Sequence, residues 1–515
     1  MLCVDGSPAS FDTTPMSAQA PSDPEERASS GIPGLDDILG GTGFPRNQMY
    51  LVEGNPGAGK TTLGLHFLME GVKRGEKVAY VVLAESEKAL RRLARSHGWS
   101  LEDVAVIESA DQTGNDDQYS LFHPAEIELG EASDTILGEI DRLRPSRVVL
   151  DSLSEVRLLA QDPLRYRRQI LTLRKFFDDR NITALLLDFA SDNNDRQLES
   201  LCHGIVQLSQ RTPEYGGHRR RLRVTKLRES AFRDGYHDFT IDRGGIEVYP
   251  RLVASEHGRG LGFKQETCSS GVPELDSLCG GGLDRGTSTL VLGPAGAGKS
   301  TLSAVYAKAA VERGEKVAFF VFDEVPNTLI VRGEGMSLNV RAHVDSGRLI
   351  VRQVDPAELA PGQFAHQVRH AVEVLGATMV VIDSVNGYHS AMPEENFLSA
   401  HLHELLAYLN QTNVVSIMVM TQTGLVGMGV ASPIDLSYLA DTVILLRYFE
   451  ANSEIRQAIS VMKRRTGPHE RTIRELNLDS QGIRIGAPLT QFHGVMSGQL
   501  VYDGRGLMHQ RGSPE

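Results

Sequence analysis

Short apolar runs alternate with longer amphipathic stretches along most of the chain. In the first half these runs lie at residues 49–54, 77–84, 146–152 and 183–189, and in the second half at 288–293, 316–322, 378–384 and 414–420. An apolar run without polar alternation is typical of a strand covered on both faces, as in a parallel α/β sheet. The pattern therefore predicts an α/β fold with mostly parallel, doubly wound sheets flanked by helices.

The sequence repeats itself after about 240 residues. GIPGLDDILGG at residues 31–41 recurs as GVPELDSLCGG at residues 271–281, and RGEKVA occurs at both 74–79 and 313–318. Self-similarity at a fixed spacing indicates duplication of a whole structural unit. We therefore expect two tandem domains of the same fold.

This duplication sets the expected domain boundaries. We expect the first domain at residues 31–250, a charged, Gly-containing linker at 251–266 and the second domain at 267–490. Residues 1–30 are rich in Ser, Pro, Ala and Asp without helical or strand periodicity, which predicts a disordered tail. Residues 491–515 are expected to form a loop and a flexible tail.

Composition narrows the class of protein. The 515 residues are 41% hydrophobic and carry a formal net charge of −13. The apolar fraction excludes a chain disordered throughout, and the acidic balance argues against a nucleic-acid partner. The four cysteines are scattered without CxxC spacing, and no secretory leader or apolar run of about 18 residues is visible. We expect a cytoplasmic protein without a membrane segment.

Each domain contains a phosphate-loop signature. GNPGAGKT at residues 54–61 and GPAGAGKS at 293–300 fit the pattern G-x-x-x-x-G-K-[ST] between an expected strand and an expected helix. Glycines allow backbone N–H groups to surround a β-phosphate, and the loop lysines are expected to reach the β- and γ-phosphates. A Gly-rich turn without a ligand is the plainer alternative, which two matches at the repeat spacing disfavour. The predicted ATP-binding residues are Gly54, Gly57, Gly59, Lys60, Thr61, Thr62, Gly293, Gly296, Gly298, Lys299, Ser300 and Thr301.

A magnesium ion bound with ATP would need hard oxygen ligands beside each loop. Thr61 and Ser300 can each supply a hydroxyl, and Asp151 and Asp383 follow apolar strands in both halves. Each aspartate could instead cap the following helix. Their paired occurrence favours the metal role.

Transfer or hydrolysis of the γ-phosphate also needs a base or a group that orients the attacking oxygen. Glu85 follows the run KVAYVVLA, and Asp323 and Glu324 follow KVAFFVF. In a parallel sheet these positions lie at the carboxyl edge, where ligands bind. The alternative is a solvated loop carboxylate, but the alignment with both phosphate loops favours a catalytic role.

The tandem phosphate loops, the GIPGLD and GVPELD motifs, and the strand ends VVLAES (81–86) and FVFDEV (320–325) together resemble the KaiC family. These are double-domain ATPases of the RecA superfamily that act in the circadian clock. The resemblance extends over residues 31–497 and implies two RecA-like domains. It also implies a homo-hexameric double ring with ATP at the subunit interfaces, slow hydrolysis in the first ring and autophosphorylation in the second.

Two basic pairs resemble residues that contact the γ-phosphate of a neighbouring subunit. They are Lys226 with Arg228, and Lys463 with Arg465. Residues two apart in a strand share a face, so each pair can converge on one anion. An edge strand protected by charge is the alternative.

The segment ASPIDLSYLADT (431–442) resembles the family's phosphorylation site. The resemblance implies that Ser437 is an autophosphorylation acceptor, with Glu324 as its base and Asp323 beside it. Tyr438 stands where the family has a phosphothreonine. Because its phenol lies farther from the backbone, we expect Tyr438 not to repeat the threonine chemistry. The alternative is that Ser437 and Tyr438 only pack an interface.

The leading hypothesis is an ATP-hydrolysing hexamer with serine/threonine autokinase activity in a clock-like system. A phosphorylation-independent ATPase scaffold that gates partner binding is the main alternative, followed by a RecA-type nucleic-acid motor. By resemblance, a KaiB-like partner of thioredoxin fold could dock on the first ring. Residues 494–500 resemble the loop that regulates the second ring, and the tail after it resembles a site for a regulator.

Overall fold

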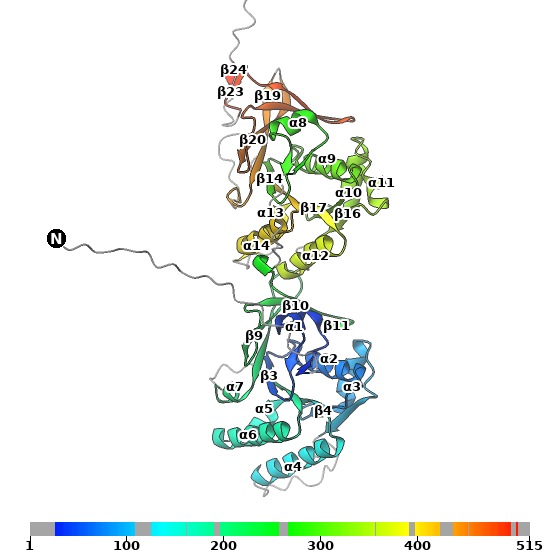
Figure 1. Ribbon diagram of the computed structural model, residues 1–515, viewed down its shortest axis with the longest axis vertical. Coiled ribbons are helices and arrows are strands. Elements are labelled where there is room, and N and C mark those ends of the chain that lie inside the picture. Colours follow the sequence, from blue (N-terminus) through cyan, green and yellow to red (C-terminus); the bar gives the residue numbers. More distant parts are fainter. Residues whose placement is uncertain are drawn as a thin grey trace, which may run out of the picture. The chain divides into compact units, whose positions relative to one another are not determined.

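The computed structural model describes residues 26–108, 125–160, 162–189, 196–256, 266–355, 357–390, 397–422, 436–451, 453–495 and 501–502. Most of the expected N-terminal tail, the expected linker and the expected C-terminal tail therefore lies outside the described residues. The chain forms two compact units, the first mainly before Val248 and the second mainly from Tyr249 onward (Figure 1).

The first unit contains a nine-stranded sheet in the order β11-β10-β9-β8-β3-β7-β6-β4-β5. The strands are β3 (Met49–Gly54), β4 (Val78–Val82), β5 (Val104–Glu108), β6 (Arg147–Asp151), β7 (Thr183–Asp188), β8 (Gly204–Arg211), β9 (Arg219–Leu227), β10 (His237–Asp242) and β11 (Gly245–Tyr249). The pairings from β8 through β3, β7, β6 and β4 to β5 are parallel.

The second unit repeats this arrangement in the order β16-β15-β17-β18-β14-β19-β20-β21-β22. The strands are β14 (Ser288–Gly293), β15 (Lys316–Val321), β16 (Leu349–Gln353), β17 (Ala377–Asp383), β18 (Val415–Thr421), β19 (Thr442–Ala451), β20 (Glu454–Arg464), β21 (Arg474–Asp479) and β22 (Gly482–Pro488). Strands β16 to β19 along this order pair in parallel, and β19 to β22 pair antiparallel. The predicted mostly parallel α/β architecture is confirmed in both units.

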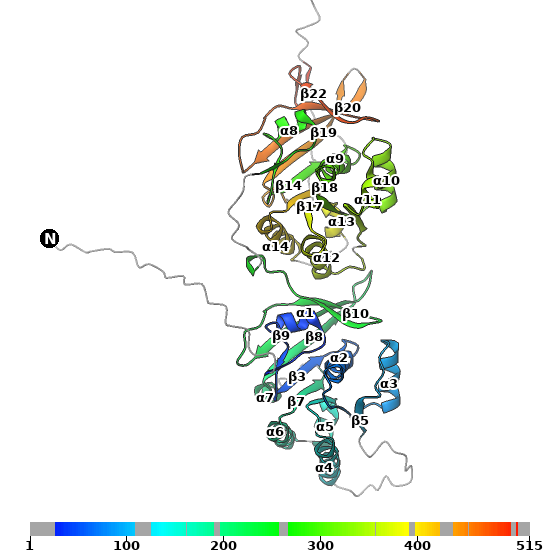
Figure 2. The same cartoon turned by 45° about the vertical axis from the view of Figure 1, so that its right-hand side comes forward.

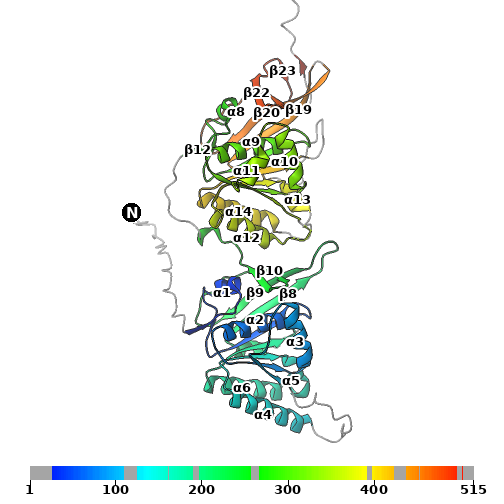
Figure 3. The ribbon, with the colours of Figure 1, turned by 90° about the vertical axis from the view of Figure 1, so that its right-hand side faces the viewer.

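Helices cover both faces of each sheet. In the first unit they are α1 (Pro33–Ile38), α2 (Lys60–Lys73), α3 (Glu87–Ser96), α4 (Ala125–Leu143), α5 (Leu153–Ala160), α6 (Pro163–Asp179) and α7 (Arg196–Leu201). In the second they are α8 (Pro273–Leu278), α9 (Lys299–Glu312), α10 (Pro326–Glu334), α11 (Val340–Asp345), α12 (Pro361–Glu373), α13 (Val385–Ser390) and α14 (Leu398–Gln411). Figure 2 shows α2 and α3 on one side of the first sheet and α6 and α7 on the other. Figure 3 shows α9 and α10 on one side of the second sheet and α12 and α14 on the other.

Several short elements complete the described structure. They are the paired strands β1 (Arg27–Ala28) and β2 (Phe44–Pro45), β12 (Thr267–Cys268) and β13 (Leu283–Asp284), and β23 (Phe492–His493) and β24 (Val501–Tyr502), with a short 3₁₀ helix at Ala254–Glu256. Among the described residues, no helix combines the length and the apolarity needed to cross a membrane.

Alternation along the buried strands decides which side chains face the phosphate-loop helix α2. Val81 and Leu150 pack in one apolar cluster with Ile170 of α6. Successive strand residues point to opposite faces, so Tyr80 and Val149 face the other way. Gly64 of α2 lies so close to Val149 that an added Cβ would come within 2.9 Å of its Cγ1. The strand face beneath α2 therefore carries Tyr80.

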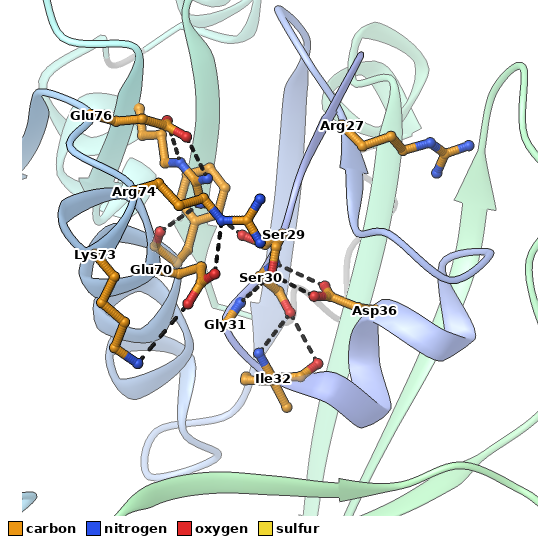
Figure 4. A network of polar contacts seen from close by, with 12 residues as sticks. Arg27, Ser29, Ser30, Gly31, Ile32, Asp36, Glu70, Lys73, Arg74 and Glu76 are labelled. Atoms are coloured by element: carbon orange, nitrogen blue, oxygen red, sulfur yellow. Dashed lines mark hydrogen bonds and ion pairs between the residues drawn. The ribbon is translucent and has the colours of Figure 1, made fainter. Parts of the chain in front are cut away.

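The repeated GIPGLD and GVPELD motifs form the same hydrogen-bonded turn in both units. In the first unit the Ser29 hydroxyl and the Ser30 backbone N–H donate to the two carboxylate oxygens of Asp36, at 2.6 and 2.8 Å (Figure 4). In the second unit Ser270 and Asp276 make the equivalent backbone contact at 2.8 Å. The duplicated aspartate thus fixes the chain entering each domain.

A buried arginine joins this turn to the first sheet. Arg147 is fully buried, and its guanidinium donates to the Ser29 carbonyl at 2.7 Å and to both carboxylate oxygens of Glu76 at 2.7 and 2.9 Å. It also lies over the ring of Phe67, 4.7 Å from the ring centroid. Burial opposes ionisation of Glu76, but its hydrogen bonds from Arg147 and Arg46 prevail and lower its pKa to about 2.

Candidate nucleotide-binding sites

The first phosphate loop joins β3 to α2. Gly59 precedes the helix with a φ of 102°, and a Cβ there would lie 2.6 Å from Cδ1 of Ile241. Only glycine fits this left-handed, crowded position without strain. The Lys60 ammonium folds back over the loop and donates to the carbonyls of Gly54 and Asn55, at 2.7 and 3.2 Å. Burial lowers the pKa of Lys60, against the nearby carboxylates.

The second phosphate loop has the same geometry between β14 and α9. Gly298 has a φ of 96°, and a Cβ there would lie 2.7 Å from Cδ1 of Leu478. The Lys299 ammonium donates to the Pro294 carbonyl at 2.8 Å. Burial lowers the pKa of Lys299 to about 8. Both loops therefore place a buried lysine beside a cradle of backbone groups that suits an anion.

The remaining predicted loop residues lie where a helix N-terminus would meet phosphate. Gly57 and Gly296 both have positive φ, at 79° and 77°. Thr62 and Thr301 follow in the first turns of α2 and α9 and are buried. Their burial leaves the backbone N–H groups of the loops, together with Lys60 and Lys299, as the groups best suited to phosphate oxygens.

The first predicted metal position brings three side chains together. The Thr61 hydroxyl donates to Oδ2 of Asp151 at 2.9 Å, and the Tyr80 hydroxyl donates to the same oxygen at 2.6 Å. Asp151 ends β6, and Thr61 is the second residue of α2, as expected for a strand end and a phosphate-loop helix. No role for Tyr80 was predicted from the sequence. The one available signal was a difference between the two repeats, because the aligned run KVAFFV has Phe319 at the position of Tyr80.

The second predicted metal position pairs Asp383 with Ser300. The Ser300 hydroxyl hydrogen-bonds to Asp383, and burial raises the pKa of this carboxyl to about 6. Oδ2 of Asp383 is buried and, within the described part of the chain, has no hydrogen-bond partner. A buried carboxylate oxygen beside a hydroxyl fits a hard cation such as Mg²⁺, because that ion supplies the missing partner. The residues therefore fit a magnesium ion.

The predicted catalytic carboxylates lie past the ends of β4 and β15. Val82 and Val321, the last residues of these strands, pair with Asp151 and Asp383, so the carboxylates lie at the same sheet edge as the metal positions. Glu85 is exposed. By contrast, Asp323 and Glu324 of the second unit each have a side-chain partner.

Those partners differ for Asp323 and Glu324. Asp323 accepts a hydrogen bond from the Ser384 hydroxyl. Glu324 is held by Arg332 of α10, whose two terminal nitrogens donate to its two carboxylate oxygens at 2.8 and 2.7 Å. Arg332 was not predicted, because its contact with Glu324 arises from the turn into α10.

The first basic pair lies away from the phosphate loop of its own domain. The Lys226 ammonium donates to the carbonyls of Glu199 and Cys202 at 2.6 and 2.7 Å, and Arg228 donates to the Ser200 carbonyl at 3.1 Å. These carbonyls precede β8, whose Gly204 pairs with Tyr50 near the start of β3. The loop follows the other end of β3, roughly 13 Å away at about 3.3 Å per residue.

The second basic pair donates hydrogen bonds to the backbone of the segment in which the phosphorylation site is predicted. The Lys463 ammonium donates to the carbonyls of Ser437 and Ala440 at 2.8 and 2.7 Å. Arg465 donates to the Tyr438 carbonyl at 2.6 Å. Ser437 is half-buried in this turn and Tyr438 is exposed.

This second pair lies at the end of β20, level with the start of β14, the strand that carries the phosphate loop. Lys463 pairs with Val443, which pairs with Leu290 early in β14. The loop begins at the opposite end, at Gly293. The structure thus brings Ser437 and the basic pair together and separates them from the phosphate loop of the same domain.

Comparisons with known proteins match both units. The family model described as "ATPase: KaiC" matches residues 28–253 and again residues 268–490. "Circadian clock protein KaiC3" of Synechocystis sp. is 26% identical over 488 residues, covering 93% of this chain and 95% of the relative. "Circadian clock protein KaiC2" of the same organism is 27% identical, covering 88% and 80%. "Circadian clock oscillator protein KaiC" of Parasynechococcus marenigrum is 24% identical, covering 92% and 93%.

Proposed function

Because this chain belongs to the KaiC ATPase family, we propose that it is a hexameric, Mg²⁺-dependent ATPase whose second ring phosphorylates itself on Ser437. ATP binding and ATPase activity follow from membership of this family. Thr61 with Asp151, and Ser300 with Asp383, would hold the magnesium ion. When bound, that ion neutralises charge on the phosphate oxygens.

The hexamer is proposed from the position of the basic pairs. Lys226 with Arg228, and Lys463 with Arg465, lie at the ends of β9 and β20, level with the starts of β3 and β14, whose other ends carry the phosphate loops. In a closed ring, a surface at one end of a domain can meet the opposite end of its neighbour. Each pair would then contact the γ-phosphate bound to an adjacent subunit. ATP would favour assembly, because a ligand contacted by two subunits stabilises their complex.

The autokinase proposal rests on a single observation: the basic pair of the second unit donates to the backbone of Ser437 and Tyr438. An interface that brings this pair to a neighbour's γ-phosphate brings the Ser437 hydroxyl there too. Its Oγ would form a bond to the γ-phosphorus while the bond to the β-phosphate oxygen breaks and ADP leaves. The neighbour's Glu324 would accept the hydroxyl proton.

The first ring is proposed to hydrolyse ATP without phosphorylating itself. Lys226 donates to the backbone carbonyl of Glu199, and Lys463 donates to the backbone carbonyl of Ser437 in the same way. Glu199, at the place of Ser437, has no hydroxyl to accept a phosphoryl group, and the neighbouring Ser200, whose carbonyl accepts from Arg228, stands at the place of Tyr438. Water is therefore the proposed nucleophile. Glu85 would orient that water.

The relatives' names support a role in biological timing. We propose that this chain acts in a circadian or clock-like system, in which a KaiB-like partner of thioredoxin fold docks on the first ring. A regulator acting on the C-terminal tail is a further proposal, and residues 496–500 and 503–515 of that region lie outside the described residues.

The autokinase proposal is tested with the full chain, Mg²⁺ and ATP labelled at the γ-phosphate. We expect covalent label on Ser437, its loss in Ser437→Ala and its retention in the matched variant Tyr438→Phe. Full labelling of Ser437→Ala would refute the assignment.

A phosphorylation-independent ATPase scaffold is the second candidate. The observation that favours it is the pairing of both Glu324 oxygens with Arg332, which occupies the proposed base. It predicts phosphate release from ATP without covalent label in the wild-type chain. The same labelling experiment therefore separates the two candidates.

A further inference from the structure

The two candidate metal positions differ in one neighbouring strand residue. In the first unit Tyr80 pairs with Val149, two residues before Asp151. In the second unit Phe319 pairs with Val381, two residues before Asp383. Residues two apart share a strand face, so Tyr80 and Phe319 occupy the same place diagonally beside the carboxylate.

Tyr80 fixes the carboxylate of the first unit. Its side chain is fully buried, and its hydroxyl donates to Oδ2 of Asp151 at 2.6 Å. The Thr61 hydroxyl donates to the same oxygen at 2.9 Å. Two donors from different elements, β4 and α2, leave this carboxylate little rotational freedom, and Oδ1 remains for the hydrated cation.

The second unit lacks this support. Phe319 is buried like Tyr80 but carries no hydroxyl. Oδ2 of Asp383 is correspondingly without a hydrogen-bond partner among the described residues. The Ser300 hydroxyl remains the donor to this carboxylate. The absence of this hydroxyl thus coincides with a buried carboxylate oxygen that has no hydrogen-bond partner among the described residues.

We propose that Tyr80 is a positioning residue that makes the first phosphate loop hold Mg²⁺ with its nucleotide more tightly than the second. Hydrogen bonds from neighbouring groups orient metal-binding side chains, so a carboxylate already held in place needs less reordering when the ion binds. The two rings would then differ in the Mg²⁺ concentration that they need. The inference rests on the proposed binding of Mg²⁺ and ATP at both loops.

The test exchanges the two residues in the full chain. Binding of a fluorescent ADP analogue is measured against Mg²⁺ concentration, with Lys299→Ala present when the first loop is studied and Lys60→Ala when the second is studied. Tyr80→Phe should raise the Mg²⁺ concentration for half-maximal binding at the first loop by about tenfold. Phe319→Tyr should lower it at the second loop. Binding in EDTA should change in neither variant.

Tyr50→Phe is the matched control. Tyr50 is a fully buried tyrosine of the same sheet whose hydroxyl donates to the Pro45 carbonyl at 2.7 Å, near the start of β3. Its loss should leave the Mg²⁺ dependence unchanged. A change equal to that of Tyr80→Phe would assign the effect to general loosening of the sheet and overturn the inference.

Two further outcomes separate this inference from the proposed function. If wild-type binding depends on Mg²⁺ but Tyr80→Phe leaves that dependence unaltered, the positioning role is wrong and the proposed function stands. If wild-type binding is indifferent to Mg²⁺ at both loops, the proposed metal role and the inference fail together.

Discussion

Arg332 donates hydrogen bonds to both carboxylate oxygens of Glu324, with nitrogen–oxygen distances of 2.8 and 2.7 Å. A carboxylate engaged in this way has its oxygens directed at a guanidinium, a strong and geometrically defined pairing. For Glu324 to accept a proton from a serine hydroxyl, at least one of those hydrogen bonds must be exchanged.

Releasing Glu324 should therefore speed phosphorylation. We expect Arg332→Gln to raise the initial rate of Ser437 labelling several-fold, and Glu324→Gln to lower it by about 100-fold or more, the usual contribution of a general base. The double variant should be as slow as Glu324→Gln. Rates are followed with labelled ATP.

Arg369→Gln serves as the control for this series. Arg369 pairs with Glu373 within α12 at 3.4 Å and should leave the rate unchanged. A rate that falls in Arg332→Gln would instead indicate that the arginine itself assists the transfer.

The basic pair of the second unit should govern assembly as well as transfer. Arg465→Ala is expected to reduce ATP-dependent hexamer formation and to lower Ser437 labelling by about 10³, as when a cation supplied by a neighbour is lost. Light scattering with ATP and with ADP measures assembly. Arg456→Ala, which removes an arginine paired with Glu454 on β20, is the control. Assembly indifferent both to nucleotide and to Arg465→Ala would contradict the proposed contact.

The pairing of Arg147 with Glu76 should make the first unit sensitive to acid. Hydrogen bonds to Arg147 and Arg46 hold the pKa of Glu76 at about 2, below its value of 4.5 in an unfolded chain. The stabilisation is thus complete above pH 4.5 and declines as the pH falls toward 2. Urea denaturation across this range should show a shallower pH dependence in Glu76→Gln than in the wild-type chain.

Removing the other partner should be more damaging at pH values where Glu76 is ionised. Arg147→Met would leave Glu76 partly buried beside one remaining arginine, and breaking such a pair costs about 3–5 kcal/mol of unfolding free energy. A loss below about 1 kcal/mol in Arg147→Met would show that this pair contributes little more than an exposed ion pair.

His66 should add a second acid-sensitive contribution at milder pH. Its Nε2 accepts the backbone N–H of Ile246 at 2.7 Å, and burial lowers its pKa from 6.5 to about 4. The unfolded chain therefore binds a proton that the folded chain excludes, so stability falls as the pH drops from 6.5 to 4. His66→Gln should reduce this slope in denaturation measurements. His218→Gln, at an exposed position, should preserve it.

The fold was predictable because its information is local and repeated. The run at residues 49–54 coincides with β3, and the glycines before Lys60 and Lys299 have the positive φ that the phosphate-loop pattern requires. The end of each buried strand also located Asp151 and Asp383. Pattern, turn chemistry and duplication all indicate the same architecture.

The hydrogen-bond partners of these residues could not be predicted from the sequence pattern. Arg332 reaches Glu324 across a turn, and Tyr80 reaches Asp151 from an adjacent strand, so both contacts depend on tertiary packing. Lys463 was identified by its resemblance to a family residue that contacts phosphate, yet its hydrogen bond to the Ser437 carbonyl depends on how β20 folds back beside that turn. Such contacts join residues whose separation in sequence carries no periodic signal.

Each basic pair lies level with the start of the strand that ends in a phosphate loop, and this placement makes activity depend on protein concentration. Under the proposed ring arrangement, each domain of a lone subunit binds ATP at one end of its sheet and carries its basic pair at the other. Dilution alone would then stop both ATP hydrolysis and Ser437 phosphorylation, because the subunits would separate. A cell could set the output of such a protein simply by how much of it is made.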